Sequence, residues 1–168
     1  MILLGIDSGL DGAVVAIQYE PAGVTRIVLA AIVPTIKTGT KRVYRVGEMV
    51  ALLRGIGAVG FAALERGGVR PGEGVKSSWS VGYGFGLWEM ALTSLGVRYE
   101  TPTPQQWQKD LYRGIVGDGK ERSVLVCDRL LPDLNLTPGR RTKPHSGLAD
   151  AGCLAVYAGR RALCPSQA

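Results

Sequence analysis

Three apolar runs, each bounded by turn residues, open the chain and predict three consecutive β-strands. They span residues 2–7, 13–19 and 24–33, and the second is rich in the β-branched residues that strands favour. Residues 8–12 combine Ser, Gly and Asp-Gly, which predicts a tight turn and therefore a β-hairpin. Pro34 ends the third run, because proline cannot donate to a sheet ladder. We expect these strands to pair antiparallel.

From residue 44 onward the spacing of apolar positions becomes that of helices. Residues 44–54 place them at i, i+3, i+4 and i+7, which predicts a helix. Residues 59–64 form another apolar run, which predicts a fourth strand that ends at Glu65. Residues 77–95 again repeat apolar residues three and four positions apart, although three glycines interrupt them. Each glycine costs a helix about 1 kcal/mol relative to Ala, so this helix is expected to approach another element closely.

The rest of the chain completes an α/β fold. Its sequence pattern predicts a fifth strand at 97–101, a short helix within 102–112, a helix at 119–131, a polar basic loop at 133–146 and a final amphipathic helix at 147–161. Strands that are separated by helices join a sheet in parallel. The sequence therefore predicts one domain over residues 1–168. Its mixed five-stranded sheet has three antiparallel strands, then two parallel ones, and helices on both faces.

Composition excludes several classes of protein. The 168 residues are 46% hydrophobic and 20% charged, which excludes a disordered chain. No apolar run approaches the ~18 residues of a membrane span, and the start of the chain lacks the basic region of a signal peptide. The three cysteines have no C-x-x-C spacing, which argues against a disulfide framework or a zinc site. Cys127 and Cys153 are expected to be small buried hydrophobic residues of a cytoplasmic protein.

A net charge of +6 and an isoelectric point near 9.5 favour an anionic partner. Three basic clusters lie in segments that are predicted to be loops: Lys37, Lys41, Arg42 and Arg45; Arg66, Arg70 and Lys76; Arg140, Arg141 and Lys143. A membrane-binding helix would carry its positive charges along one stripe, whereas scattered clusters suit the phosphate backbone of a nucleic acid. The alternative is an ordinary solvated surface.

Two acids, Asp7 and Glu65, stand at the ends of predicted strands. If the first and fourth strands are parallel neighbours, both carboxylates meet at one edge of the sheet. Asp150 lies in the first turn of the last predicted helix, and His145 precedes it by five residues. Clustered carboxylates repel one another unless a cation neutralises them, and all-oxygen ligands suit Mg²⁺ or Mn²⁺. Paired cations of this kind clamp a phosphate during its displacement, which is nuclease chemistry.

Each of these residues also has a plainer interpretation. Strand-end acids are often turn residues, and an acid in the first turn of a helix interacts favourably with the helix dipole. Asp11, followed by Gly12, is better explained as hairpin turn chemistry than as a ligand. A lone histidine such as His145 is more often a surface loop residue than a functional one.

A series of short motifs over nearly the whole chain resembles one known family. They lie at residues 5–12 (GIDSGLDG), 64–65, 71–78 (PGEGVKSS), 96–109 (GVRYETPTPQQWQK), 120–122, 131–134, 145–151 (HSGLADA) and 157–161. In order and spacing they resemble the RuvC-type Holliday-junction resolvases of the RNase H-like superfamily. The nearest likeness is to the phage-borne and chloroplast branch. Ser8 departs from the proline that commonly follows the first catalytic acid, and His145 stands where many relatives have an acid.

The resemblance implies a metal-dependent endonuclease of DNA recombination and repair, which cuts four-way junctions by paired symmetric nicks that leave 5′-phosphate and 3′-hydroxyl ends. It implies two Mg²⁺ or Mn²⁺ ions per active site: Asp7 bridges them, Glu65 holds one, Asp150 holds the other, and His145 binds a metal or moves a proton. The implied partners are branched DNA and a second copy in a homodimer, with no membrane and no nucleotide cofactor. The expected DNA contacts are Arg66, Arg70, Lys76, Ser77, Ser78, Lys41, Arg42, Arg140, Arg141 and Lys143.

Three alternatives come from other classes. An inactive junction-binding relative is disfavoured because Asp7, Glu65 and Asp150 are all present. A nuclease for other branched DNA or for RNA–DNA hybrids stays open. The segment at 5–9 is also similar to the first phosphate motif of actin-like and sugar-kinase ATPases, but those enzymes need two such domains, and 168 residues are too few.

Overall fold

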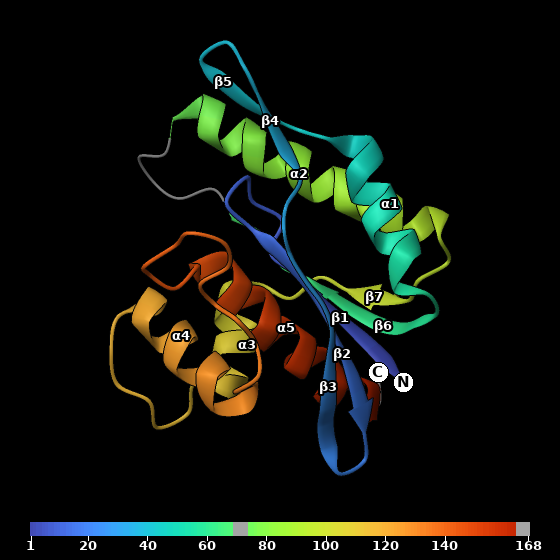
Figure 1. Cartoon of the computed structure of the whole chain (residues 1–168), viewed down its shortest axis with the longest axis vertical. Coiled ribbons are helices and arrows are strands. Elements are labelled where there is room, and N and C mark those ends of the chain that lie inside the picture. Colours follow the sequence, from blue (N-terminus) through green and yellow to red (C-terminus); the bar gives the residue numbers. More distant parts are fainter. Residues whose placement is uncertain (69–73, 164–168) are drawn as a thin grey trace.

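A computed structural model describes residues 1–68 and 74–163 and has one central sheet of mixed direction (Figure 1). Its strand order is β3-β2-β1-β6-β7. The strands are β1 (Ile2–Ile6), β2 (Ala13–Glu20), β3 (Gly23–Ile32), β6 (Val59–Leu64) and β7 (Tyr99–Glu100). β1, β2 and β3 pair antiparallel, whereas β6 pairs parallel with both β1 and β7. The predicted sheet, including the parallel contact between the first and fourth predicted strands, is confirmed.

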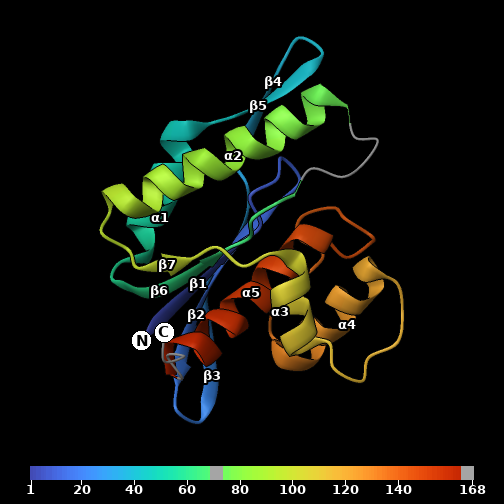
Figure 2. The same ribbon diagram turned by 180° about the vertical axis from the view of Figure 1, so that it is seen from behind.

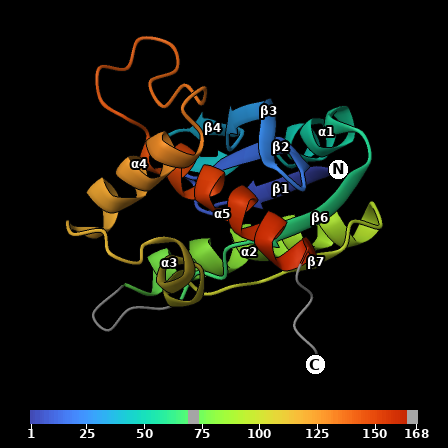
Figure 3. The ribbon, with the colours of Figure 1, turned by 90° about the horizontal axis from the view of Figure 1, so that it is seen from below.

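Helices cover both faces of this sheet (Figures 1 and 2). Their bounds are α1 (Val46–Ile56), α2 (Val75–Ser94), α3 (Pro104–Leu111), α4 (Gly119–Leu130) and α5 (Ser146–Leu163). α1 and α2 share one hydrophobic core with the sheet, and α3, α4 and α5 share a second core with the other face. Figure 3 shows α5 lying across the strands on its side of the sheet.

One glycine in the central strand sets how closely α5 approaches. Leu3, Leu4 and Ile6 of β1 are fully buried, as expected for a strand that is covered on both faces. A Cβ atom at Gly5 would collide with the backbone oxygen of Ala151 and the backbone nitrogen of Ala155. Only glycine therefore allows α5 to lie directly on β1, and this contact brings the start of α5 to the end of β1.

The segment between β3 and α1 was not predicted correctly. It forms a separate two-stranded hairpin of β4 (Thr35–Thr38) and β5 (Lys41–Tyr44), which extends over the N-terminal end of α2 (Figures 1 and 2). Its strands have four residues each and are mostly exposed, and Tyr44 is the one buried residue of the two. Such short, polar strands leave no apolar run to detect. The basic residues Lys41 and Arg42 therefore lie on a strand, not in a loop.

Other boundaries shift by small amounts. α1 begins at Val46 and ends at Ile56, two residues later than predicted at each end, and β7 keeps only two residues of the strand expected at 97–101. Cys127 and Cys153 are free and buried, as expected, while Cys164 lies outside the described residues. In the described ranges no helix is both long enough and apolar enough to cross a membrane.

Candidate active site

Two carboxylates meet where β1 and β6 end. Ile6 and Leu64, the last residues of these parallel strands, are register partners. The next residues along each chain are Asp7 and Glu65, and the Glu65 N–H still donates to the Ile6 oxygen at 2.9 Å. Parallel neighbours deliver their following residues to the same edge of a sheet, so the predicted juxtaposition of Asp7 and Glu65 is confirmed.

Asp150 reaches the same edge from α5. That helix begins at Ser146, one residue earlier than predicted, so Asp150 lies beyond the first turn and the dipole interpretation does not apply. Burial, followed by the charge of Asp7, raises the pKa of Asp150 to about 7, although Ser123 and Lys120 partly oppose the shift. The fold therefore places a carboxyl group where its charged form is unfavourable.

The carboxyl group of Asp7 also has a raised pKa. Burial raises the pKa of its carboxyl group, Asp11 adds to the effect, and a hydrogen bond opposes it. That bond runs from the Gly9 N–H to Asp7 Oδ1 at 3.2 Å and belongs to the turn after β1. Two partly buried carboxylates that repel each other keep a high energy unless a proton or a cation neutralises one of them, and such perturbed pairs mark functional sites.

Glu65 has a partner that the sequence did not reveal. The indole of Trp107, on α3, donates from Nε1 to Glu65 Oε1 at 3.0 Å. The Ser8 hydroxyl, which is also buried, donates to the backbone oxygen of Glu65 at 3.4 Å. Ser8 thus bridges the two strand ends.

His145 is buried, with 4% of its surface exposed, so its interpretation as a surface loop residue is wrong. It caps α5, because its Nδ1 atom accepts the Leu148 N–H at 3.3 Å. Burial lowers the pKa of His145, and the charges of Arg141 and Arg42 lower it further. The ring is therefore neutral near pH 7, and with Nδ1 acting as an acceptor its proton is assigned to Nε2.

The donor set at this edge suits a hard divalent cation. Asp7, Glu65 and Asp150 offer carboxylate oxygens, which Mg²⁺ and Mn²⁺ prefer. Across residues 1–68 and 74–163, however, no three His, Cys, Asp or Glu side chains lie close enough together to hold one metal ion. The observation that fits a cation is the Asp7–Asp150 pair: burial and then the charge of Asp7 raise the pKa of Asp150, and a divalent cation would stabilise the charged form of both carboxylates.

Two of the predicted basic clusters act on this edge. Arg42 of β5 forms an ion pair with Asp11, with 2.7 Å between Nη2 and Oδ1, and both Arg42 and Arg141 influence His145. The other candidate DNA contacts are Arg66, Lys76, Ser77, Lys41, Arg140 and Lys143, which are exposed, and Ser78, which is half-buried. Arg70 lies outside the described residues. Asp11 is 87% exposed at its side chain and sits in the turn, as its turn interpretation predicted.

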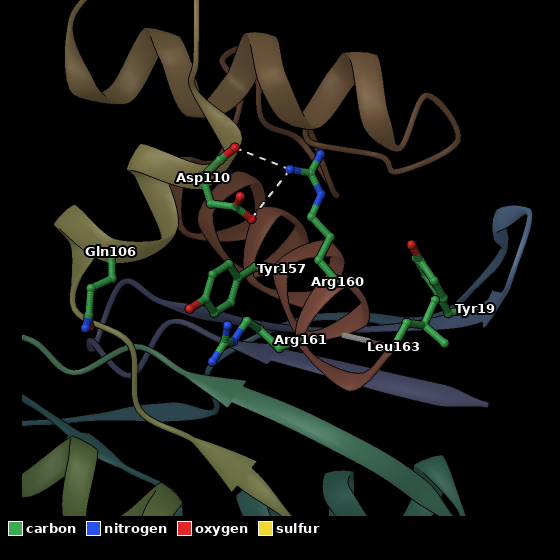
Figure 4. Close-up of a pocket in the computed structure, with 7 residues that line it drawn as sticks. All are labelled: Tyr19, Gln106, Asp110, Tyr157, Arg160, Arg161 and Leu163. Atoms are coloured by element: carbon green, nitrogen blue, oxygen red, sulfur yellow. Dashed lines mark hydrogen bonds and ion pairs between the residues drawn. The ribbon is translucent and has the colours of Figure 1, made fainter. Parts of the chain in front are cut away.

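A hollow of about 580 Å³ lies at the other end of α5 and offers no comparable chemistry (Figure 4). Its two arginines are already paired. Arg160 contacts Asp110 at 3.5 Å, and Arg161 contacts Glu100 at 3.4 Å. The candidate active site is therefore the edge formed by β1, β6 and the start of α5.

Comparison with known proteins gives a fold but no sequence family. No protein-family model and no curated protein matches the sequence. Among solved structures, the chain is similar to Thermus thermophilus RuvC in complex with Holliday junction substrate. The TM-score is 0.69 at 21% identity, over 97% of this chain and 96% of that one. A second Thermus thermophilus RuvC structure gives a TM-score of 0.67 at 24% identity, over 99% and 98%. The chain therefore has the RNase H-like fold of RuvC.

Proposed function

We propose that this protein is a metal-dependent endonuclease that resolves four-way DNA junctions by paired symmetric nicks. The observation that carries the proposal is the pair of partly buried carboxylates, Asp7 and Asp150, at a sheet edge flanked by Arg42 and Arg141. An acidic pocket within a basic surface suits a phosphodiester substrate. The fold of a protein that was solved with a Holliday junction supports the choice of substrate.

In this proposal the carboxylates hold two cations, with Asp7 shared between them, Glu65 on one and Asp150 on the other. Bound there, Mg²⁺ or Mn²⁺ supplies Lewis-acid stabilisation of the charge that develops on the phosphate. The partial burial that raises the pKa of Asp150 also lowers the local dielectric, which strengthens electrostatic contacts at this edge. The nicks would leave 5′-phosphate and 3′-hydroxyl ends.

The geometry of His145 favours a hydrogen-bond donor over a metal ligand. Its Nδ1 atom accepts the Leu148 N–H, which leaves Nε2 with the proton that it can donate to a phosphate oxygen or to water. A metal bond through Nε2 would require the opposite tautomer and the loss of the helix cap. We therefore assign His145 to hydrogen-bond donation.

Three substitutions at His145 distinguish these roles. His145→Ala is expected to lower the turnover of junction cleavage by about 10²-fold or more, the usual contribution of a positioned hydrogen-bond donor that stabilises developing charge. Both Asn and Asp can cap a helix, but only Asn donates, so His145→Asn should retain more activity than His145→Asp. Single-turnover cleavage rates measure this. If His145→Asp were the more active variant, His145 would be a metal ligand instead.

The basic residues on both sides of the site would bind DNA backbone. Lys41 and Arg42 lie on the β4–β5 hairpin, while Arg140, Arg141 and Lys143 lie on the loop before α5. These segments come from different parts of the chain, and both act on His145 through Arg42 and Arg141. Phosphates bound along them would bring the scissile phosphate to the carboxylates.

A two-fold homodimer would supply the two active sites that paired nicks require. The exposed face of α2 suits this contact because it is mostly apolar, with charge only at its borders, at Lys76 and Glu89; it consists of Val75, Trp79, Gly82, Tyr83, Gly86, Met90 and Thr93. At Gly82 and Gly86 a Cβ would meet no described atom within 4 Å, so these glycines leave room for a second helix to approach. An exposed apolar face of this length is typical of an interaction surface.

A charge placed on this face should separate the subunits. Met90 is 69% exposed, so Met90→Glu leaves the folded subunit intact but would bury an unpaired charge between two subunits. We expect dimer affinity to fall about 10-fold or more in analytical ultracentrifugation, which corresponds to 1.4 kcal/mol. Leu125→Glu is the matched control, since Leu125 is 57% exposed on α4. Equal dimer affinity of Met90→Glu and wild type would place the interface elsewhere.

Substrate choice separates this function from its alternatives. Cleavage of a synthetic four-way junction is compared with cleavage of matched duplex, flap and RNA–DNA hybrid substrates. Preference for the junction supports resolution, preference for the flap or hybrid supports the other nuclease functions, and binding without cleavage supports an inactive junction-binding protein. Membership of the phage-borne and chloroplast branch, a cytoplasmic location and a role in recombination and repair stay predictions.

A further inference from the structure

The indole of Trp107 makes a specific polar contact with a proposed metal ligand. Trp107 is fully buried, and its Nε1 atom lies 3.0 Å from Oε1 of Glu65. The two residues are 42 positions apart and come from α3 and from the end of β6. An oxygen of the half-buried Glu65 carboxylate is therefore held by a side chain that takes part in the core.

The surroundings of Trp107 hold the indole rigidly. α3 begins with a complete capping box between Thr103 and Gln106 and has Pro104 as its first residue. These features fix the first turn of the helix, and Trp107 is the fourth residue of that turn. At the other end Tyr112 packs edge-on against the Trp107 ring, with centroids 5.3 Å apart and planes at 85°. Arg122 covers the other side of Tyr112, 5.1 Å from its centroid.

A second tryptophan shows that burial alone does not explain the contact. Trp88 is as fully buried as Trp107, but it lies in the core on the opposite face of the sheet. Among the described residues its Nε1 atom has no hydrogen-bond partner. The fold thus tolerates a buried indole whose N–H is unpaired, so packing does not require the bond from Trp107 to Glu65.

We propose that Trp107 is a positioning residue, which holds Glu65 in the orientation needed to bind a divalent cation. This inference rests on the proposed function, because it assigns Glu65 to a cation. A carboxylate that is already held by a hydrogen-bond donor loses less conformational freedom when it binds a metal. Removal of such a donor typically weakens metal affinity about 10- to 100-fold. Trp107 itself would touch neither the metal nor the DNA.

The test is direct binding of Mn²⁺ to the intact protein without DNA, measured by calorimetry. Trp107→Phe keeps the aromatic packing and removes only the donor. We expect it to bind Mn²⁺ about 10- to 100-fold more weakly than wild type, with cleavage restored at saturating Mn²⁺. Trp88→Phe is the matched control and should bind Mn²⁺ as wild type does. Equal affinity of Trp107→Phe and wild type would overturn the inference.

A second measurement does not depend on the folding of any Trp107 variant. In the wild-type protein the indole N–H resonance of Trp107 is followed by NMR as Mg²⁺ is added. It should shift, while that of Trp88 stays fixed, and the shift should be absent in Glu65→Gln. A resonance that does not respond in a protein that binds Mg²⁺ would overturn the positioning role and leave the nuclease proposal standing. Wild-type protein that binds neither cation would overturn both.

Discussion

Asp7→Asn is expected to abolish DNA cleavage while the protein still binds four-way junctions. Asp7 is the carboxylate that both proposed cations would share, and its charge adds to the burial that raises the pKa of Asp150. Metal stabilisation of a phosphate transition state contributes several kcal/mol, so its loss should slow cleavage about 10³-fold or more. Glu65→Gln and Asp150→Asn should behave in the same way. Junction cleavage in Mg²⁺ and gel-shift binding in Ca²⁺ measure the two properties separately.

Asp11→Asn provides the matched control for this series. Asp11 is only four residues from Asp7, but its side chain is 87% exposed and is paired with Arg42. It should therefore keep most of the wild-type cleavage rate. Near-normal cleavage by Asp7→Asn, Glu65→Gln or Asp150→Asn would remove that residue from the active site.

Asp150→Asn is expected to stabilise the metal-free protein, and to do so more at pH 8 than at pH 5. The pKa of Asp150 is about 7 in the folded chain, against 3.8 for the ordinary carboxyl group. The folded state therefore binds more protons than the unfolded state between these values, and the stability of the wild type falls as the pH rises through that range. Above pH 7 the full destabilisation by the charged Asp150 applies, and it is on the order of 4 kcal/mol at about 1.36 kcal/mol per pKa unit.

Thermal unfolding in the presence of EDTA measures the stability of Asp150→Asn and wild type at the two pH values. The melting temperature of Asp150→Asn should exceed that of wild type at pH 8, and the difference should shrink at pH 5. Asp128→Asn, at an exposed position of α4, should show no such dependence. A variant that is less stable than wild type at pH 8 would mean that Asp150 supports the fold rather than strains it.

The acids could be found from the sequence because strand periodicity is a strong signal. β1 and β6 are continuous apolar runs, and each is followed at once by an acid, Asp7 or Glu65. Such runs indicate strands that are buried on both faces, and parallel order then brings their ends together. To place Asp150 near these acids, only the start of α5 had to be predicted, and the pattern located it to within one residue.

What could not be predicted depends on contacts between distant residues. The β4–β5 hairpin has too few apolar residues to produce a period, although it brings Arg42 to the active-site edge. The bond from Trp107 to Glu65 joins residues 42 positions apart, and a tryptophan in an amphipathic helix indicates only burial. His145 looked like a loop residue because it precedes α5, and its burial comes from packing that the local sequence does not encode.

The account is tested most directly with a supercoiled plasmid that carries an inverted repeat extruded as a cruciform, which contains one four-way junction. Two symmetric nicks across that junction convert the circle to a linear molecule, whereas a single nick gives an open circle. With Mg²⁺, the wild-type protein should yield linear DNA cut at the inverted repeat, and no product should form in EDTA or with Asp7→Asn. Open circles alone, or no cleavage by the wild type in Mg²⁺ or Mn²⁺, would contradict the assignment as a junction-resolving nuclease.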